Sequence, residues 1–421
     1  MSDRPIASSS LAAQIDLAAQ AVEPRVIAWR RDLHEHPELG NREFRTADIV
    51  LAHLRRLGLD DIRTGVAHTG VVGVLMGALP GPTVALRADM DALPVTEAVD
   101  LPFASKVRTT WNGEEVGVMH ACGHDCHTAI LMGVAEILAG LRAELRGTVK
   151  FIFQPAEELP PEGEEGGAKL MIAQGALENP VPQAIFGLHV TSRLPLGIIG
   201  YRPGPTMASS DRFKITVHGK QTHGAAPWLG VDPIVTAAQV ILGLQTVVSR
   251  GVDIAREPAV VTVGMIKGGV RENIIPDSVE MRGTIRAFDE EMRDEIHERV
   301  TTLAEAVSRG SRAGCTVCID KNYPVTVNDP VLTEAMVPTL KRVAGAGGLQ
   351  LVPKVTGAED FSFFQRIVPG LFFFIGVTPP GTDPTKAHSN HSPRFFADER
   401  ALVIGVRALA HLACDYLESR A

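Results

Sequence analysis

Residues 128–153 decide the fold class and read TAILMGVAEILAGLRAELRGTVKFIF. The first part, 128–141, is apolar and long enough for a buried helix, whereas 148–153 has the length and the aromatic and β-branched content of a buried strand. A helix at 168–174 and another strand at 184–190 are predicted to follow. Strands that alternate with helices in this way predict an α/β layered domain with a mostly parallel sheet.

The same alternation extends outward in both directions. On the N-terminal side, apolar residues recur at helical spacing over 11–35, where Pro24 predicts a break and the start of a second helix. Two strand-like runs come next, at 71–76 and 83–87. After residue 328 the pattern resumes with a helix to about 343, strands near 351 and at 371–376, and a helix at 398–417. We therefore expect the layered domain in two pieces, 1–196 and 318–421.

Between these pieces, residues 197–317 have a different pattern. Apolar Val279, Met281 and Ile285 alternate with charged residues, as in a half-buried strand of an antiparallel sheet. The predicted order is strand 213–217, helix 232–248, strands 260–266 and 279–285, helix 289–308 and strand 316–319. This β-α-β-β-α-β order is the ferredoxin-like pattern and predicts an inserted α+β domain.

Composition limits the classes of function. A chain of 421 residues favours two domains, and 41 basic against 49 acidic residues give a net charge of −8, which argues against a nucleic-acid partner. No run approaches the about 18 consecutive apolar residues of a membrane helix, and charges such as Asp16 interrupt the N-terminal apolar positions. Five cysteines argue against a disulfide framework. We expect a cytoplasmic protein with no membrane partner.

One pair of cysteines is spaced as in some redox and zinc sites. Cys315 and Cys318 form a CxxC, but they lie on a predicted strand. Residues three apart on a strand point to opposite faces, so these two thiols are not expected to bind one metal together.

The densest group of candidate metal ligands is His120-Ala-Cys-Gly-His-Asp-Cys-His127. Cys122 and His124 share one face only if the chain turns between them, which Gly123 permits, and Asp125 can cap the helix that follows. A thiolate and an imidazole at a helix N-terminus form a plausible half of a metal site. The alternative is a polar helix start that contains a buried cysteine.

Two adjacent glutamates follow the strand at 148–153. They end the segment Phe153-Gln-Pro-Ala-Glu-Glu158, in which Pro155 excludes a helix interior. On non-helical backbone Glu157 and Glu158 project in different directions, so one can bind a metal while the other carries a proton. The alternative is a solvated acidic loop, because further glutamates follow.

Other candidates lie where strands end. His189 is near the end of the strand at 184–190, the edge at which open α/β sheets bind ligands, and His391 follows a loop rich in proline and glycine. A lone histidine at either place is more often structural. Asp89 and Asp91 end another strand on one side and are candidates to orient a ligand imidazole, or else to form a strand-end turn.

Taken together, these motifs resemble the dinuclear-metal aminoacylase and carboxypeptidase family, and within it the hippurate hydrolase and auxin-conjugate (IAA-amino acid) hydrolase branch. The resemblance covers almost the whole chain. Its motifs are Leu33–Gly40, Arg87–Pro94, His120–His127, Gln154–Glu158, Gly187–Val190, Gly219–His223, Asn273–Asp277, Gly357–Ser362 and His391–Pro393.

The resemblance implies a set of metal ligands. Matched residue by residue, the ligands are Cys122, His124, Glu158, His189 and His391. They would hold two divalent metal ions per subunit, and Glu157 would be the general base. One thiolate among imidazoles and carboxylates suits manganese, zinc, cobalt or nickel.

The resemblance also assigns roles to the inserted domain. Residues 197–317 correspond to the family's lid, which usually forms the contact of a homodimer or higher homo-oligomer. On the lid, His223 matches a histidine that helps to polarise the scissile carbonyl, and Asn273 matches a residue near the substrate. The chain departs from the family pattern in two places. Extra residues follow Glu158, and Trp228 stands where many relatives carry histidine. Both departures bear on the substrate and not on the chemistry.

The function implied is metal-dependent hydrolysis of small N-acyl amino acids to a carboxylic acid and a free amino acid. A metallo-carboxypeptidase or dipeptidase is the first alternative, although such relatives usually carry an aspartate where this chain has Cys122. A catalytically inactive ligand-binding relative is less favoured, because Glu157 and the ligand positions are all present. A thiol enzyme using Cys122 or Cys126 would leave His189 and His391 unexplained.

Overall fold

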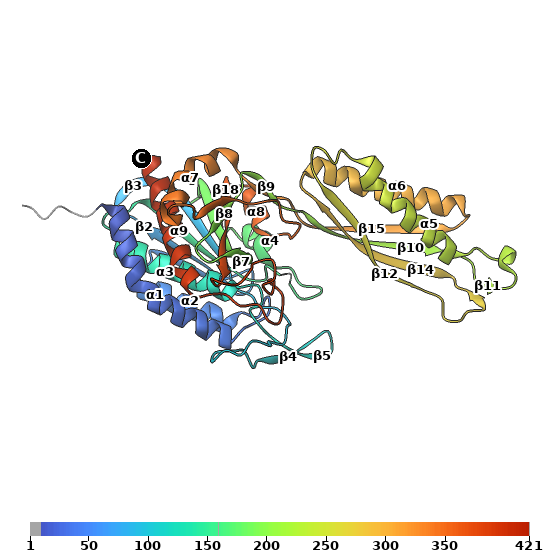
Figure 1. The fold of residues 1–421 in the computed structure, drawn as a ribbon, viewed down its shortest axis with the longest axis horizontal. Helices are drawn as coiled ribbons and strands as arrows, with labels where there is room; N and C mark the ends of the chain where they lie inside the picture. Colours follow the sequence, from blue (N-terminus) through green and yellow to red (C-terminus); the bar gives the residue numbers. More distant parts are fainter. Residues whose placement is uncertain (1–9, 159, 421) are drawn as a thin grey trace, which may run out of the picture. The chain divides into compact units, whose positions relative to one another are not determined.

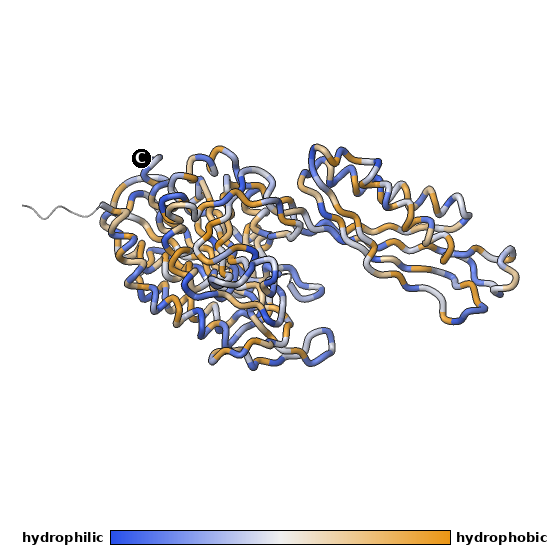
Figure 2. The backbone as a smooth tube through the Cα atoms, viewed as in Figure 1, coloured by the Kyte–Doolittle hydropathy of each residue, from blue (hydrophilic) through white to orange (hydrophobic). Residues whose placement is uncertain are grey.

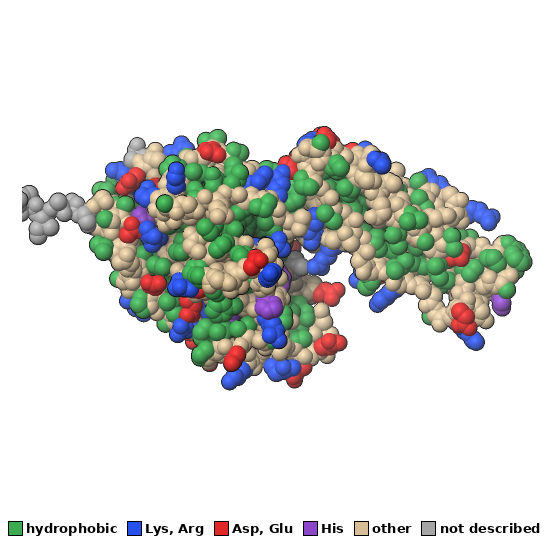
Figure 3. Space-filling view, in the orientation of Figure 1, with side chains coloured by type: hydrophobic (Ala, Val, Ile, Leu, Met, Phe, Trp, Pro, Cys, Tyr) green, Lys and Arg blue, Asp and Glu red, His purple; other side chains and the backbone are tan. Residues whose placement is uncertain are grey.

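A computed structural model describes residues 10–158 and 160–420 (Figure 1). The chain forms two compact units. The first comprises the residues up to 204, then 328–352 and the residues from 363 onward; the second comprises 205–327 and 353–362. Charged side chains of both signs intermingle on the face seen in Figure 3.

The N-terminal segment of the first unit differs from the prediction. Residues Leu11–Glu35 form one helix, α1, with Pro24 in its interior, so the expected break into two helices is wrong. The residues buried along α1 lie on both sides of the proline: Ile15, Ala19, Val22, Val26 and Leu33. Packing of this continuous stripe against neighbouring helices offsets the hydrogen bond that the proline cannot donate. A further helix, α2 (Phe44–Arg56), was not predicted.

The first unit is built on a mixed sheet. Its strand order is β1 (Asp61–Val66), β2 (Gly70–Met76), β6 (Arg146–Gln154), β3 (Leu79–Asp89), β7 (Ala184–Pro195), β18 (Gly370–Thr378), β8 (Ile199–Tyr201) and β17 (Leu349–Leu351). The central strands β6, β3, β7 and β18 run parallel to their neighbours in this group, whereas β1 and β2 form an antiparallel edge. The predicted α/β layered domain with a mostly parallel sheet is confirmed.

Helices α3 (His124–Gly140) and α9 (Arg400–Ser419) pack against this sheet, and α1 packs against both of them (Figure 1). The remaining elements of the chain up to residue 207 and after 325 are short, except α7 (Pro330–Ala344), which contributes Leu332, Met336 and Leu340 to the core. They are β4 (Arg108–Trp111), β5 (Glu114–Gly117), α4 (Gly167–Ala173), β9 (Gly204–Met207), β16 (Thr326–Asn328), α7 and α8 (Phe361–Gln365).

The second unit has the predicted ferredoxin-like order. Along the chain run β10 (Ser210–His218), α5 (Pro233–Thr246), β12 (Ala259–Gly268), β14 (Ser278–Ala287), α6 (Glu290–Gly310) and β15 (Gly314–Tyr323). The strands pair antiparallel in the order β12-β14-β10-β15. Hydrophobic and hydrophilic residues alternate along these strands (Figure 2), and the apolar side of the sheet packs on α5 and α6. Cys315 is half-buried and Cys318 is exposed on β15, as expected for opposite faces.

A buried ion network joins β10 to α6 in the second unit. The carboxylate of Asp211, which is fully buried, accepts a hydrogen bond from Arg293 Nε at 2.9 Å and lies 2.8 Å from His297 Nε2. Although burial alone would raise the pKa of Asp211, the bonds from Arg293 and His297 hold that pKa below its usual value.

The helical segment Pro233–Gly251 comprises α5 and the π-helix η2 (Val247–Gly251), and its length and mean hydropathy of 1.2 would by themselves suit a membrane span. Its apolar residues divide between two faces. Ala237, Val240 and Leu244 are buried in the core of the second unit, whereas Val235 and Leu242 are 56% and 72% exposed.

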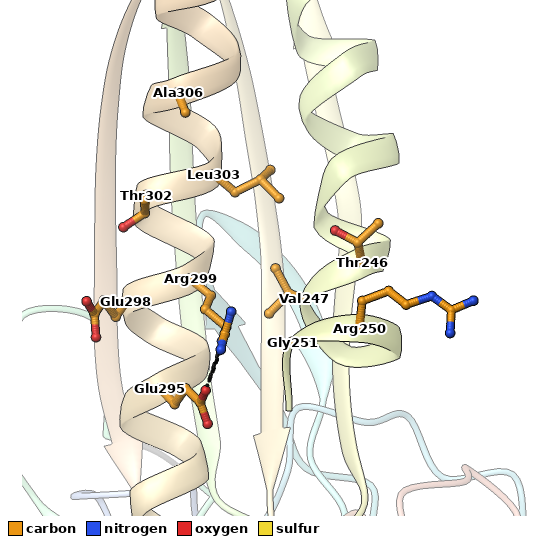
Figure 4. A pocket seen from close by; sticks show the side chains of 10 residues that line it. All are labelled: Thr246, Val247, Arg250, Gly251, Glu295, Glu298, Arg299, Thr302, Leu303 and Ala306. Atoms are coloured by element: carbon orange, nitrogen blue, oxygen red, sulfur yellow. Dashed lines mark hydrogen bonds and ion pairs between the residues drawn. The ribbon is translucent and has the colours of Figure 1, made fainter. Parts of the chain in front are cut away.

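A groove of about 540 Å³ lies between the end of α5 and α6 (Figure 4). Arg250 lines one wall, and the opposite wall carries Arg299, whose guanidinium bonds to Glu295 at 2.7 Å. The groove therefore carries charges of both signs, and its lining contains none of the predicted site residues.

Candidate metal centre

A left-handed glycine sets the start of α3. Gly123 has φ +97°, and a Cβ at this position would come within 2.4 Å of Val190 Cγ2, so a side chain would fit neither the backbone nor the space. The turn places Cys122 before the helix and His124 at its first residue. Asp125 does not cap the helix, contrary to the prediction, because its carboxylate bonds to other buried groups.

Those groups are Arg30 and His34 of α1. Arg30 Nε donates to Asp125 Oδ2 at 2.8 Å, and His34 Nδ1 lies 2.8 Å from the same oxygen. His34 Nε2 lies 3.1 Å from Glu97 Oε1. Burial alone would lower the pKa of His34, but Asp125 and Glu97 raise it. A buried network thus ties α1 to the first turn of α3, next to His124.

His124 is oriented by Asp89, the last residue of β3, and by Asp91, which follows that strand. Its Nδ1 lies 3.2 Å from Asp91 Oδ1 and 3.7 Å from Asp89 Oδ1. Its Nε2 is buried without a hydrogen-bond partner among the described residues and lies 3.9 Å from Glu157 Oε2. Burial alone would lower the pKa of His124, but Asp89 and Asp91 raise it to about 10. These carboxylates therefore favour positive charge at this ring.

Cys122 lies between two other imidazoles. Its Sγ is 3.3 Å from His189 Nε2 and 3.3 Å from His391 Nε2, and His391 Nε2 is also 2.9 Å from Glu158 Oε1. His189 Nδ1 lies 2.7 Å from the carbonyl of Val190, so Nδ1 donates there and Nε2 faces the thiol. Strand β7 runs on to Pro195, so His189 lies inside the strand and not at its end.

The donors form one cluster. Five groups of possible ligands among the described residues have donor atoms within 4.8 Å of one another. Three of the five consist only of the predicted ligands and Glu157, namely Cys122, His124 and His189; Cys122, Glu158 and His391; and His124, Glu157 and Glu158. Thiolate, imidazole and carboxylate are the ligand types of zinc and related divalent metals. Burial, together with Glu158 and Glu157, raises the pKa of the Cys122 thiol, so its thiolate needs a cation beside it. With the unpartnered Nε2 of His124, this donor set fits a divalent metal centre.

Asp91 also holds the glutamate turn. Its two carboxylate oxygens accept the backbone N–H groups of Glu157 and Glu158, each at 3.0 Å. Asp89 instead accepts from Arg87 at 2.6 Å and lies 2.6 Å from His127 Nδ1. Both aspartates are buried and contact the groups around the donor cluster.

His127 belongs to this arrangement, although sequence reasoning gave it no role. Its Nδ1 bonds to Asp89, and its Nε2 accepts the N–H of Val190 at 2.9 Å. Both ring nitrogens are therefore occupied, and the ring links α3 to β7 next to His189. The spacing of His124 and His127, one turn apart on a helix, was the available signal.

Asn390 is a second residue that sequence reasoning missed. Its Nδ2 donates to the carbonyls of Cys122 and Val190 at 2.9 and 3.0 Å. The next residue, His391, has φ +71°, and its N–H donates to Ala121 at 2.8 Å. Asn390 therefore connects the loop of His391 to the strand and turn that carry the other donors.

The other two predicted residues lie in the second unit. His223 is on β11 (Thr222–His223), which pairs with β13 (Ile274–Ile275), and the N–H of Gly224 donates to the carbonyl of Asn273 at 2.8 Å. The structure thus places His223 and Asn273 side by side, and both are exposed. The N–H of Ala225 donates to His223 Nδ1 at 3.0 Å, which leaves Nε2 as the outward ring nitrogen.

Comparison with known proteins identifies the family. Residues 85–415 match the model of peptidase family M20/M25/M40. This chain belongs to that family. This membership confirms the resemblance drawn from the motifs. The protein is therefore a metal-dependent amide hydrolase.

Three similar proteins illustrate the family's range. Thermostable carboxypeptidase 2 of Saccharolobus solfataricus is 40% identical over 94% of this chain and 96% of its own length. N-acetylcysteine deacetylase of Bacillus subtilis is 40% identical over 96% of this chain and 100% of its own. The solved structure of the YXEP protein of Bacillus subtilis, a dinuclear metal-binding peptidase of family M20, is 38% identical with a TM-score of 0.79, covering 95% of this chain and 99% of that one.

Proposed function

We propose that this M20-family enzyme hydrolyses the amide bond of small N-acyl amino acids and releases a carboxylic acid and a free amino acid. The observation that carries the proposal is the partly buried cluster in which Glu157 lies beside thiol, imidazole and carboxylate donors. The relative from Bacillus subtilis that is named for N-acetylcysteine deacetylation supports this substrate class.

Five residues of the first unit would hold two divalent metal ions. They are Cys122, His124, Glu158, His189 and His391, and manganese, zinc, cobalt or nickel would suit them. When bound, such ions lower the pKa of a water molecule and polarise a carbonyl oxygen. Asp91 and Asp89 keep Nδ1 of His124 engaged, so that its Nε2 is the nitrogen that would be available to a metal ion.

Glu157 acts as the general base in this scheme. Its carboxylate takes a proton from the attacking water and then delivers it to the nitrogen of the departing amino acid. Asp91 holds the backbone N–H of Glu157 at 3.0 Å and so fixes the point from which that side chain extends. Without such orientation, the proton would have to travel through a less well-aligned hydrogen bond.

The second unit would act as the lid. His223 would donate to the carbonyl oxygen that gains charge, and Asn273 would bind a polar group of the substrate. The lid would also form the contact of a homodimer or higher homo-oligomer. Its exposed apolar residues support this proposal, because a subunit contact would bury them. They include Trp228, Leu242 and Val270, which are 74%, 72% and 94% exposed. The five unpaired cysteines, all within the described residues, accord with a cytoplasmic location.

A peptidase activity is the second candidate. A relative of equal identity, 40%, is named thermostable carboxypeptidase 2, and a carboxypeptidase cleaves the same kind of bond. The two functions differ in the group that precedes the scissile amide, which is a simple acyl group in one and an aminoacyl residue in the other. Cys122 favours the first, because peptidase relatives usually carry an aspartate at this position.

The test is reconstitution followed by a substrate panel. The protein is stripped with a chelator, restored with Mn²⁺, Zn²⁺, Co²⁺ or Ni²⁺ in turn, and assayed for release of free amine. The panel pairs acetyl, benzoyl, indoleacetyl and longer acyl groups with several amino acids and includes simple dipeptides. Metal-dependent release from acyl conjugates, and weak release from dipeptides, is the expected result. Faster cleavage of dipeptides would favour the peptidase, and no release with any metal would contradict both.

A further inference from the structure

The motif Leu33–Gly40 and the residues just after it have so far no part in the reaction. Glu43 is fully buried and occupies the N-cap position of α2, yet its side chain makes no capping bond to that helix. Glu38 does this instead, because its carboxylate accepts the N–H groups of Arg45 and Thr46 at 3.0 and 2.8 Å. The carboxylate of Glu43 is therefore directed elsewhere.

It reaches the turn that carries the two site glutamates. Glu43 Oε1 accepts the N–H of Ala156 at 2.9 Å, and Oε2 accepts the hydroxyl of Thr69 at 2.6 Å. Ala156 has φ +52°, a left-handed conformation that costs free energy for a residue with a Cβ and persists only when its surroundings enforce it. The bond from Glu43 is part of that enforcement.

Three successive amides of this turn bond to carboxylates from two distant segments. The N–H of Ala156 bonds to Glu43, and those of Glu157 and Glu158 bond to Asp91. Without Glu43, Asp91 would hold only the second and third of these amides, and the left-handed Ala156 would lose its bond. With Glu43 in place, the directions of both glutamate side chains are fixed from two sides.

We propose that Glu43 is a positioning residue that fixes the Glu157–Glu158 turn through the N–H of Ala156, by hydrogen bonding and not by its charge. This inference rests on the proposed function, because it assigns Glu43 to the placement of the general base and of one metal ligand. Burial and the nearby Asp91 raise the pKa of Glu43 to about 8, which agrees with a role that does not need the charge.

The test compares Glu43→Ala, Glu43→Gln and, as a control from the same segment, Glu38→Ala. Glutamine keeps an oxygen for the N–H of Ala156 and an amide that donates to Thr69 Oγ1, whereas alanine keeps neither. Glu38→Ala removes a helix cap that does not touch the turn. Affinity for Zn²⁺ and Mn²⁺ is measured by chelator competition, kcat and KM on an acyl conjugate that the wild type cleaves, and folding by thermal unfolding.

We expect Glu43→Ala to lose about 10- to 100-fold in metal affinity and in kcat, with a much smaller change in KM, as for other residues that orient ligands. Glu43→Gln should restore both values to near those of the wild type. Glu38→Ala should lower the unfolding temperature and leave metal affinity and kcat unchanged. If Glu43→Ala does not fold, Glu43→Asp, whose carboxylate is withdrawn by one methylene, carries the same expectation.

Two results would overturn the proposal. The first is a folded Glu43→Ala enzyme with wild-type metal affinity and kcat, and the second is a Glu43→Gln enzyme as impaired as Glu43→Ala. Metal affinity separates this proposal from the proposed function. A wild type that cleaves no substrate, with metal binding that is weak in Glu43→Ala and normal in Glu43→Gln, would contradict the hydrolase and support the positioning role.

Discussion

The donor cluster of the first unit and the His223–Asn273 pair of the second differ in how they are held. In the cluster, His124, His189 and the glutamate turn each bond to another group that limits their motion. The pair in the second unit is exposed and is held by the backbone of a short ladder. The side chains of the cluster are therefore held in place before any ligand binds. The exposed side chains of the pair contact few other groups and can act only on a ligand or partner that binds to them.

The cluster and the pair also differ in buried charge. Buried carboxylates and a thiol gather in the first unit, and buried charge is costly unless it is compensated. His223 and Asn273 lie in solvent and carry no such cost. Replacing a metal ligand of the cluster, or a group that holds one, should therefore affect metal binding and stability, whereas changes in the pair should affect turnover alone.

The largest effect is expected for Glu157→Gln. Loss of the general base should lower kcat by about 10²- to 10⁴-fold, while metal content stays at the wild-type level because the ligands remain. Steady-state kinetics and metal analysis of the same preparation measure both. A variant that keeps full turnover would remove Glu157 from the mechanism.

The second-largest effect on kcat is expected for His223→Ala, which tests the difference between the two units. If His223 donates to the developing oxyanion, its loss should cost about 10²- to 10³-fold in kcat. Because the side chain is exposed, the unfolding temperature and metal affinity should not change. A fall in metal affinity would break the distinction between the two units.

Asp91→Ala is expected to have a smaller effect, and this effect should be on metal affinity, which His223→Ala leaves unchanged. It removes the partner of His124 Nδ1 and of two amides, so metal affinity should fall by about 10- to 100-fold. Chelator competition measures the change, and His223→Ala serves as the matched control from the exposed pair. Unchanged affinity would mean that the ring is held well enough by Asp89.

The smallest effect concerns acid stability of the second unit. The folded pKa of Asp211 lies below its unfolded value, so its bonds to Arg293 and His297 stabilise the fold fully above about pH 4 and less as the pH falls through the folded pKa. The protection of β10 and α6 against hydrogen exchange, corrected for the intrinsic exchange rate at each pH, should therefore fall in acid. Asp211→Asn should flatten that dependence. An identical pH dependence in the variant would exclude Asp211 as its source.

Most of the fold could be predicted from the spacing of apolar residues along the sequence. The predictions that were wrong have physical causes. Pro24 was expected to divide α1, but the buried stripe from Ile15 to Leu33 is continuous, and packing overrides the local rule. Helix α2 was overlooked, although Val50 and Leu54 show the apolar spacing of a helix that packs one face.

The sequence named candidate ligands of the site, but not the groups that hold them. Motifs named Cys122 and His124, because those residues are only two apart in sequence and flank the turn at Gly123. The partners of the rings could not be found in this way. His127 depends on the N–H of Val190, which is 63 residues away, and Ala156 depends on Glu43 across 113 residues. Such bonds exist only once the tertiary fold has formed.

The place of β18 in the sheet has a consequence for synthesis on the ribosome. This strand lies between β7 and β8, although it is made long after them, so the first unit still lacks a central strand when the second unit has been completed. Cys122 likewise waits for His391, which is 269 residues later in the chain. The second unit can therefore fold while the nascent chain is still attached, whereas the metal donors can assemble only near the end of translation.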